Sequence, residues 1–279
     1  MAHLGMMNRL GIRRVTDNGA LLDGGASGDI LLPKRDVPAR AQPGDKIEVF
    51  VYQDAEDRPR ATTRKPLAEA GRFAALRVVS TTASGAYLDW GLPTDLFVPR
   101  SEQQDNMAQG ESYVVFIFLD KKNHRPIASS KLEKFFSLRP LSYEEGEEVD
   151  LLVYARTDLG YKAVVNQAHG GILYKNEVFQ QLTIGRQLKG YIKKIRDDRK
   201  IDLSLQRAGY QGVDAVSRTI LNALKKQGGR MAVTDKSPPA EIYSRFGVSK
   251  KTFKMAIGSL YKKRLISIDA NGISLTGEG

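Results

Sequence analysis

The chain has 279 residues, 41% of them hydrophobic, and a formal net charge of +11 at pH 7. It has no cysteine, which excludes disulfides and thiolate metal sites, and no apolar run of about 18 residues, which excludes a transmembrane helix. Segment 1–10 lacks the apolar core of a signal peptide, so we expect a cytoplasmic protein that does not enter a membrane.

The positive charge is concentrated in the last third of the chain. Residues 186–279 hold 20 Lys and Arg against 8 Asp and Glu, a net charge of +12, whereas residues 1–185 hold 23 against 24. Such a local excess suits a polyanionic partner, although solubility alone could also explain it.

The first 205 residues contain a threefold repeat. In each copy three glycines are separated by 14 and then 25 residues, and a hydroxyl residue follows the third glycine after 19 more. The glycines are Gly5, Gly19 and Gly44, then Gly71, Gly85 and Gly110, then Gly146, Gly160 and Gly185. Each copy is long enough to be a domain. The second and third copies are separated by nine extra residues, around Leu132 to Tyr143.

The second copy shows the expected strands most clearly. Alternating patterns separated by turn residues predict strands over 73–80, 85–89, 96–98, 113–119 and 126–129. Five short strands in about 65 residues favour a small closed barrel of the oligonucleotide-binding class. We therefore expect a mainly β chain with a C-terminal α+β part. Its domains would be three five-stranded barrels over 1–65, 66–131 and 141–208, and a final domain over 209–279.

The motifs of these copies resemble the S1 RNA-binding domain. Copy two has Gly85-Ala86-Tyr87-Leu88-Asp89 and Leu96-Phe97-Val98-Pro99, and copy three ends in Asp198-Arg199-Lys200-Ile201-Asp202-Leu203-Ser204. Copy one is the most divergent. The resemblance implies binding of single-stranded RNA through aromatic rings that stack on bases.

The resemblance also indicates which positions would contact RNA. Two residues after the second glycine lie Leu21, Tyr87 and Lys162, and after the apolar pair of the next strand lie Pro33, Pro99 and Tyr174. Copy one lacks every aromatic at these positions, which puts its RNA binding in doubt. The predicted contacts of copies two and three are Tyr87, Arg100, Lys162, Tyr174 and Lys175.

Strand alternation separates surface from core. We expect Leu88 to face the core and Tyr87 the surface. Trp90 is expected in the core or at the barrel rim, and the resemblance implies a core position for Phe97, which is therefore expected to be a packing residue.

A second set of candidates lies on the basic strand near the end of copy three. Its cations alternate with Ile192 and Ile195, which predicts an apolar inner face and a phosphate-binding outer face, with a solvated edge strand as the alternative. These candidates are Lys189, Tyr191, Lys193, Lys194 and Arg196.

No metal or cofactor site is expected. His3, His124 and His169 are far apart in the sequence, and none shares a ligand spacing with a carboxylate. The acidic run 144–148 is better explained as a solvated linker than as a cation site.

Beyond residue 205 the pattern becomes helical. Val213, Val216, Ile220 and Leu224 predict an amphipathic helix to Lys226. A second helix is expected over 240–246, and a third begins after Ser249 as its N-cap. An Asn271-Gly272 turn then predicts a hairpin, and three helices with a hairpin make a winged helix.

The third helix would be the recognition element. Phe253, Ala256, Ile257 and Leu260 recur with helical spacing and are expected to be buried. The predicted nucleic-acid contacts on and after this helix are Lys250, Lys251, Lys254, Tyr261, Lys262 and Lys263.

The order of domains resembles the bacterial conserved virulence factor B family. Segments 235–238, 246–254 and 256–262 are similar to its C-terminal signature. This resemblance implies an RNA-binding regulator of gene expression, and we do not expect an enzyme.

Three other functions compete with this one. The winged helix could bind DNA in a transcription regulator, or the chain could be a protein-binding adaptor of the ribosome or polymerase. A ribonuclease is disfavoured, because the four domains use the whole chain and leave no acidic or histidine cluster for hydrolysis. The sequence does not fix the oligomeric state; we expect a monomer.

Overall fold

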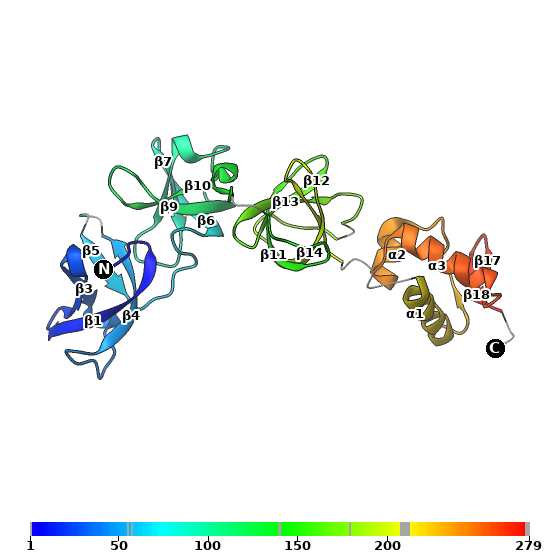
Figure 1. The fold of residues 1–279 in the computed structure, drawn as a ribbon, viewed down its shortest axis with the longest axis horizontal. Coiled ribbons are helices and arrows are strands. Elements are labelled where there is room, and N and C mark those ends of the chain that lie inside the picture. The colour runs from blue at the N-terminus through cyan, green and yellow to red at the C-terminus, as the bar shows by residue number, and fades with distance from the viewer. Residues whose placement is uncertain are drawn as a thin grey trace.

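The computed structural model describes residues 2–54, 56, 58–138, 141–178, 180–206 and 213–276. Three closed five-stranded β-barrels follow one another along the chain, and a helical domain with a small sheet follows the third (Figure 1). This is the fold class predicted from the sequence. Within the described ranges, no helix combines the length and the apolar character needed to cross a bilayer.

The three barrels share one strand order, in which the third strand pairs with the fifth. Barrel 1 consists of β1 (Met6–Thr16), β2 (Gly19–Asp23), β3 (Asp29–Pro33), β4 (Lys46–Gln53) and β5 (Pro59–Thr62). Barrel 2 consists of β6 (Phe73–Thr81), β7 (Gly85–Asp89), β8 (Leu96–Pro99), β9 (Ser112–Leu119) and β10 (Pro126–Ser129). Barrel 3 consists of β11 (Glu148–Arg156), β12 (Gly160–Val165), β13 (His169–Tyr174), β14 (Gln187–Ile195) and β15 (Ile201–Ser204). All five strands predicted for copy two are present, with ends that agree within one residue.

Four short 3-10 turns lie between or after the strands. They are η1 (Gly25–Ser27), η2 (Lys34–Asp36), η3 (Arg100–Glu102) and η4 (Leu132–Phe135). The last of these belongs to the extra residues between copies two and three.

The repeated second glycine has a steric cause. A Cβ on Gly19 would lie 2.0 Å from the carbonyl oxygen of Leu32, and one on Gly160 would lie 2.0 Å from that of Leu173. Both glycines also have a φ of +140° or more, where other residues are strained. A Cβ on Gly85 would meet the carbonyl oxygen of Val98 at 2.2 Å. Each barrel therefore needs a glycine where its second and third strands meet.

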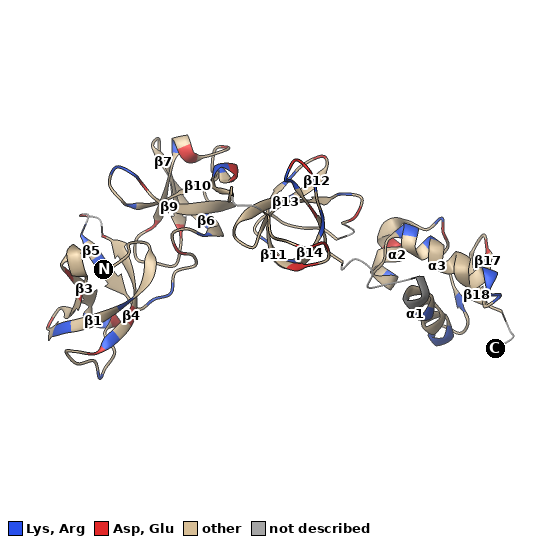
Figure 2. Cartoon of the chain, viewed as in Figure 1, with Lys and Arg blue, Asp and Glu red and all other residues tan. Residues whose placement is uncertain are grey.

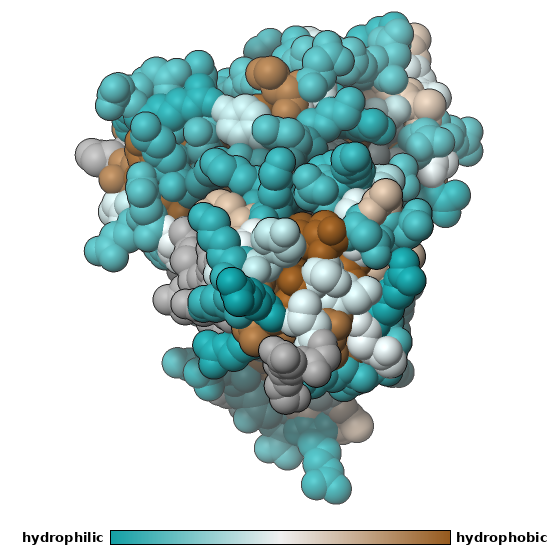
Figure 3. Space-filling view, turned by 90° about the vertical axis from the view of Figure 1, so that its right-hand side faces the viewer, coloured by the Kyte–Doolittle hydropathy of each residue, from teal (hydrophilic) through white to brown (hydrophobic). Residues whose placement is uncertain are grey.

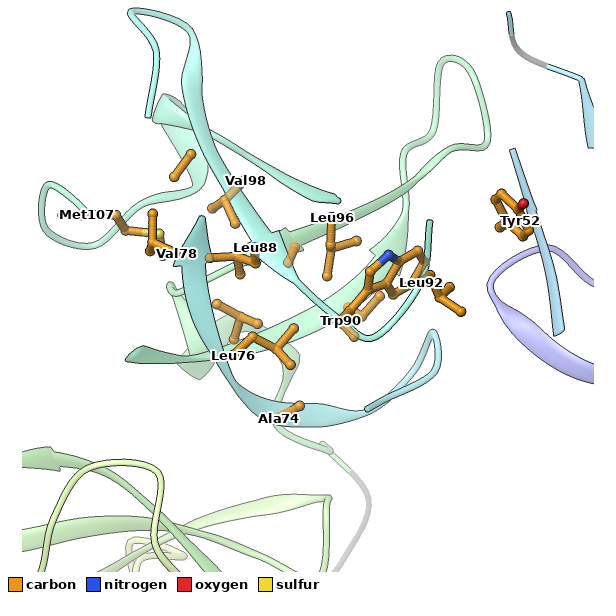
Figure 4. Packing of buried hydrophobic residues seen from close by; sticks show 14 of the residues in the cluster. Tyr52, Ala74, Leu76, Val78, Leu88, Trp90, Leu92, Leu96, Val98 and Met107 are labelled. Carbon is orange, nitrogen blue, oxygen red and sulfur yellow. The ribbon is translucent and has the colours of Figure 1, made fainter. Parts of the chain in front are cut away.

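Barrels 1 and 2 share a hydrophobic core. Phe50 of β4 meets Trp90 edge to face, with ring centroids 5.4 Å apart. Trp90 is 3% exposed, as its predicted core or rim position requires. Figure 4 shows Tyr52 of barrel 1 beside the Trp90 end of the core of barrel 2. This packing gives the two barrels a common apolar contact.

Barrels 2 and 3 are joined by a cluster of aromatic rings. Phe73 lies 4.7 Å from Phe116 and 5.6 Å from Phe136 between ring centroids. Gln167 of barrel 3 accepts a hydrogen bond from the backbone N–H of Phe73 at 2.7 Å and donates one to its carbonyl at 3.0 Å. Burial at this junction raises the pKa of Tyr154 to about 12, with a further contribution from Glu133.

The C-terminal domain has the predicted helices and hairpin. It consists of α1 (Val213–Lys226), β16 (Arg230–Met231), α2 (Pro239–Phe246), α3 (Lys250–Lys262), β17 (Ile266–Asp269) and β18 (Gly272–Leu275). The sequence analysis did not predict β16, which pairs with β18. The four residues predicted for the buried face of α3 are all buried. The side chain of Val213 and the expected 208/209 boundary lie outside the described residues.

Local capping fixes α3. The Ser249 hydroxyl accepts a hydrogen bond from the backbone N–H of Thr252 at 3.1 Å, as predicted for an N-cap. Gly247 ends α2 in the left-handed region, at a φ of +67°.

Viewed from the side of the C-terminal domain, the molecule shows a small apolar area within a mostly hydrophilic surface (Figure 3).

Candidate nucleic-acid interface

The outer face of barrel 2 carries a pair of aromatic rings. Leu88 is fully buried and Tyr87 is half-buried, so strand β7 alternates as the sequence predicts. Tyr87 lies opposite Phe97 of β8, and their ring centroids are 5.0 Å apart. Two neighbouring, partly exposed rings offer a surface on which bases can stack.

Phe97 is a correction to the sequence analysis, which expected it to be a packing residue of the core. In the structure Leu96 and Val98 face the core, and Phe97 between them is half-buried on the outer face. The alternation of Leu96, Phe97 and Val98 predicts this outward position, whereas the resemblance implies a core residue at Phe97. Arg100, the predicted cation beside this pair, is exposed. Its backbone N–H donates a hydrogen bond to the carbonyl of Ser84 at 2.9 Å.

The aromatic pair is part of a longer row across barrel 2. Ile127 of β10 is in register with Phe97 on one side and with Phe118 of β9 on the other. Directly paired residues point to the same face of a sheet, so the row runs over four strands. Its members are Tyr87, Phe97, Ile127 and Phe118.

The equivalent positions differ in the other barrels. In barrel 1 the row begins with Leu21, Leu31 and Arg60, and in barrel 3 it begins with Lys162, Ile172 and Asp202. At these first three positions only barrel 2 has neighbouring rings, and only barrel 3 begins with a cation.

Barrel 3 has a groove of about 600 Å³ on the face that carries Lys162 and Ile172, which is equivalent to the face of barrel 2 with the Tyr87–Phe97 pair. Its floor and walls come from β12, β13 and the β14–β15 turn, together with residues that follow η4. The polar and aromatic residues that line it include Lys162, Tyr174, Arg196, Arg199 and Lys200. The structure therefore brings together three of the predicted contacts, Lys162, Tyr174 and Arg196.

Tyr174 and Arg196 are held against each other at the edge of this groove. The Arg196 guanidinium carbon lies 5.9 Å from the centroid of the Tyr174 ring, and Arg196 Nη2 donates to the Tyr174 hydroxyl. Asp202 accepts hydrogen bonds from Arg196 Nε at 2.9 Å and from the Tyr174 hydroxyl at 3.2 Å. Asp202 thus fixes both side chains, which leaves a ring and a cation ordered beside the groove.

The candidate residues of the basic strand β14 do not share one surface, although the sequence predicted that they would. Lys189 pairs with Asp150 at 2.7 Å, and this hydrogen bond raises the pKa of Lys189. The Tyr191 hydroxyl donates to Glu148 at 3.2 Å. Both residues therefore lie against β11, apart from the groove that Arg196 lines.

The remaining candidates of barrel 3 are exposed. Lys193 pairs with Glu177, Lys194 follows it on β14, and Lys175 lies just after β13. Their roles in binding stay predictions.

The winged helix presents the candidates predicted on α3. Lys251, Lys254 and the following Lys262 and Lys263 are exposed, Tyr261 is 58% exposed, and Lys250 is half-buried. Lys254 lies 3.7 Å from Asp235. Residues 213–276 hold 12 Lys and Arg against 4 Asp and Glu, and Figure 2 shows cations on α1 and along α3.

Comparisons with known proteins agree with this architecture. The S1 domain family matches residues 4–64 and 70–131, and the CvfB-like winged helix domain family matches residues 218–275. The chain is similar to conserved virulence factor B of Staphylococcus aureus, with 24% identity over 85% of this chain and 81% of that protein. The protein of the same name from Staphylococcus epidermidis is also 24% identical, over 85% of this chain and 82% of its own length.

A solved structure also covers most of the chain. It is a multidomain protein with nucleic acid binding domains from Streptococcus pneumoniae, 24% identical, with a TM-score of 0.43 over 98% of each chain. The matching families include S1 and winged-helix domains and no catalytic domain.

Proposed function

The chain belongs to the CvfB-like family of tandem S1 domains with a C-terminal winged helix, and from this premise we propose that it binds single-stranded RNA. The barrels would supply stacking and the winged helix would supply charge. Binding of this kind suits a regulator that controls gene expression after transcription.

The observation that carries the proposal is the pair of equivalent outer faces on barrels 2 and 3. Barrel 2 presents the Tyr87–Phe97 pair there, and barrel 3 presents a groove with Tyr174 and Arg196. A flexible single strand can place its bases on such rings, whereas bases inside a duplex are already stacked on one another. The geometry therefore favours single strands over duplexes.

The winged helix supports the proposal through its charge. Each phosphate that a lysine neutralises adds about −0.7 to the slope of log affinity against log salt for a single strand. Because Lys251 and Lys254 are exposed on α3, Lys251→Ala with Lys254→Ala should make this slope shallower. A domain that binds weakly by itself still raises the affinity of the whole chain by making the second contact intramolecular.

The test is a comparison of three ligands on the full chain. Fluorescence anisotropy would measure its affinity for a single-stranded RNA, the DNA of the same sequence, and duplex DNA at one salt concentration. We expect the RNA to bind most tightly and the affinity to fall steeply with salt. Tighter binding of duplex DNA would indicate a DNA-binding regulator, and an absence of binding to all three would contradict the proposal.

A further inference from the structure

The extra residues between copies two and three form η4, and the proposed site does not use its Lys134 and Phe135. Turn η4 begins at Leu132, which is 4% exposed and packs in the junction between barrels 2 and 3. The next residues, Glu133 and Lys134, are exposed, and Phe135 is half-buried. The turn is therefore anchored at one end and presents charged and aromatic side chains at the surface.

This turn extends the aromatic row of barrel 2. The ring of Phe135 lies 5.0 Å from that of Phe118, the last member of the row. The ammonium of Lys134 lies 5.8 Å from the Phe118 centroid and 5.0 Å from the Phe135 centroid, and it pairs with Glu102. Two rings and a cation thus lie together where the row reaches η4.

The same turn also reaches the groove of barrel 3. Glu133 accepts a hydrogen bond from Lys162 Nζ at 2.9 Å, and both residues line the groove. A second cleft, of about 790 Å³, is lined by Lys134, Glu133 and Lys162 as well. The row that begins at Tyr87 thus reaches η4 at Phe118, past Ile127, which is only 8% exposed, and η4 in turn contacts Lys162 of barrel 3.

We propose that Phe118, Phe135 and Lys134 form an additional stacking subsite, which joins the faces of barrels 2 and 3 into one continuous site for a single strand of RNA. The rings would stack a base and the lysine would contact a phosphate. This inference rests on the proposed function, since it assumes that the outer faces of the barrels bind RNA.

The chain offers a matched control inside the same cluster. The ring of Phe116 is enclosed on two sides, by Phe73 at 4.7 Å and by Phe135 at 4.3 Å with an interplanar angle of 24°. Phe118 has only one ring contact among the described residues, the one with Phe135. Both rings are half-buried, but Phe116 has a second ring contact within the junction, so it serves as the structural control for Phe118.

The experiment measures affinity for two single-stranded RNAs with the full chain. One RNA has about 6 nucleotides, enough for one barrel, and the other has about 20, enough to extend beyond it. We expect Phe118→Leu and Lys134→Ala to weaken binding of the long RNA, by about 5- to 50-fold for the loss of the ring. Binding of the short RNA should change by less than about 3-fold, because it can occupy the other subsites.

Two control variants and the wild type distinguish a direct RNA contact from a loss of structure. Phe116→Leu should lower the melting temperature but keep the affinity for the long RNA, and Lys46→Ala on barrel 1 should leave it unchanged. Wild-type affinity in Phe118→Leu and Lys134→Ala would overturn the inference alone, as would an equal loss in Phe116→Leu. If the wild-type chain binds neither RNA, the proposed function fails together with the inference.

Discussion

Removal of the carboxylate at Glu133 should make the protein bind RNA more tightly. Glu133 pairs with Lys162 inside the groove of barrel 3, at 2.9 Å, and the two side chains are 72% and 40% exposed. Exposed ion pairs contribute only about 0.2–1 kcal/mol, so the pair opens at little cost. In Glu133→Gln the amide no longer repels phosphates, and Lys162 is free to contact one.

The expected gain follows from these magnitudes. An affinity increase of about 2- to 5-fold at low salt corresponds to about 0.4–1 kcal/mol. One additional phosphate contact should also steepen the salt slope by up to about 0.7. The turn itself should stay in place, because Leu132 is buried and Phe135 packs on Phe116.

The assay is fluorescence anisotropy of a labelled single-stranded RNA over a series of salt concentrations. The matched control is Glu56→Gln on barrel 1, which removes a similarly exposed carboxylate, 65% exposed, from its pair with Arg58. The control should bind like the wild type. Unchanged or weaker binding by Glu133→Gln would refute the assignment of Lys162 to the RNA site.

Three further predictions concern stacking, folding and alkaline pH. Tyr87→Ala and Phe97→Ala should each weaken RNA binding by about 1–3 kcal/mol, whereas Leu21→Ala in barrel 1 should have little effect. If Tyr87→Ala binds RNA normally and is folded by circular dichroism, bases do not stack on this surface. Gly160→Ala should destabilise barrel 3 by more than about 3 kcal/mol in denaturant unfolding, because its Cβ would lie 2.0 Å from a carbonyl oxygen, and a wild-type midpoint would disprove this cause of the repeat. Burial raises the pKa of Tyr154 from 10.0 to about 12, so its contribution to folding stability is complete below pH 10 and is lost as the pH rises to about 12. Tyr154→Phe should therefore lose less folding stability than the wild type between pH 10 and 12. Identical stability profiles of the two proteins over this pH range would argue against burial of the phenol.

The sequence predicted the fold well because each local signal agreed with the next. Glycine spacing located the three barrels, and strand alternation located their inner faces. The predicted strands of copy two and the buried face of α3 are all present. The two-residue strand β16 was missed because it is too short to show a period, and it forms only by pairing with β18.

The candidate site was less predictable, because it depends on contacts between residues distant in sequence. Lys189 has the spacing of a phosphate-binding lysine, but Asp150, on the neighbouring strand β11, lies 2.7 Å away. Phe97 and Phe118 acquire a common surface only through their register with Ile127. Likewise, sequence alone gave no reason to join η4 to the groove of barrel 3, which required the Glu133–Lys162 contact.

The central claim is that RNA lies on the outer faces of barrels 2 and 3. Photocrosslinking of the full chain to a single-stranded RNA containing 4-thiouridine, followed by mass spectrometry of the linked peptides, tests it most directly. The account predicts crosslinks in the peptides that contain Tyr87, Phe97 and Tyr174. Crosslinks confined to the surface of β11 and β14 around Lys189 and Tyr191, or to the winged helix alone, would contradict it.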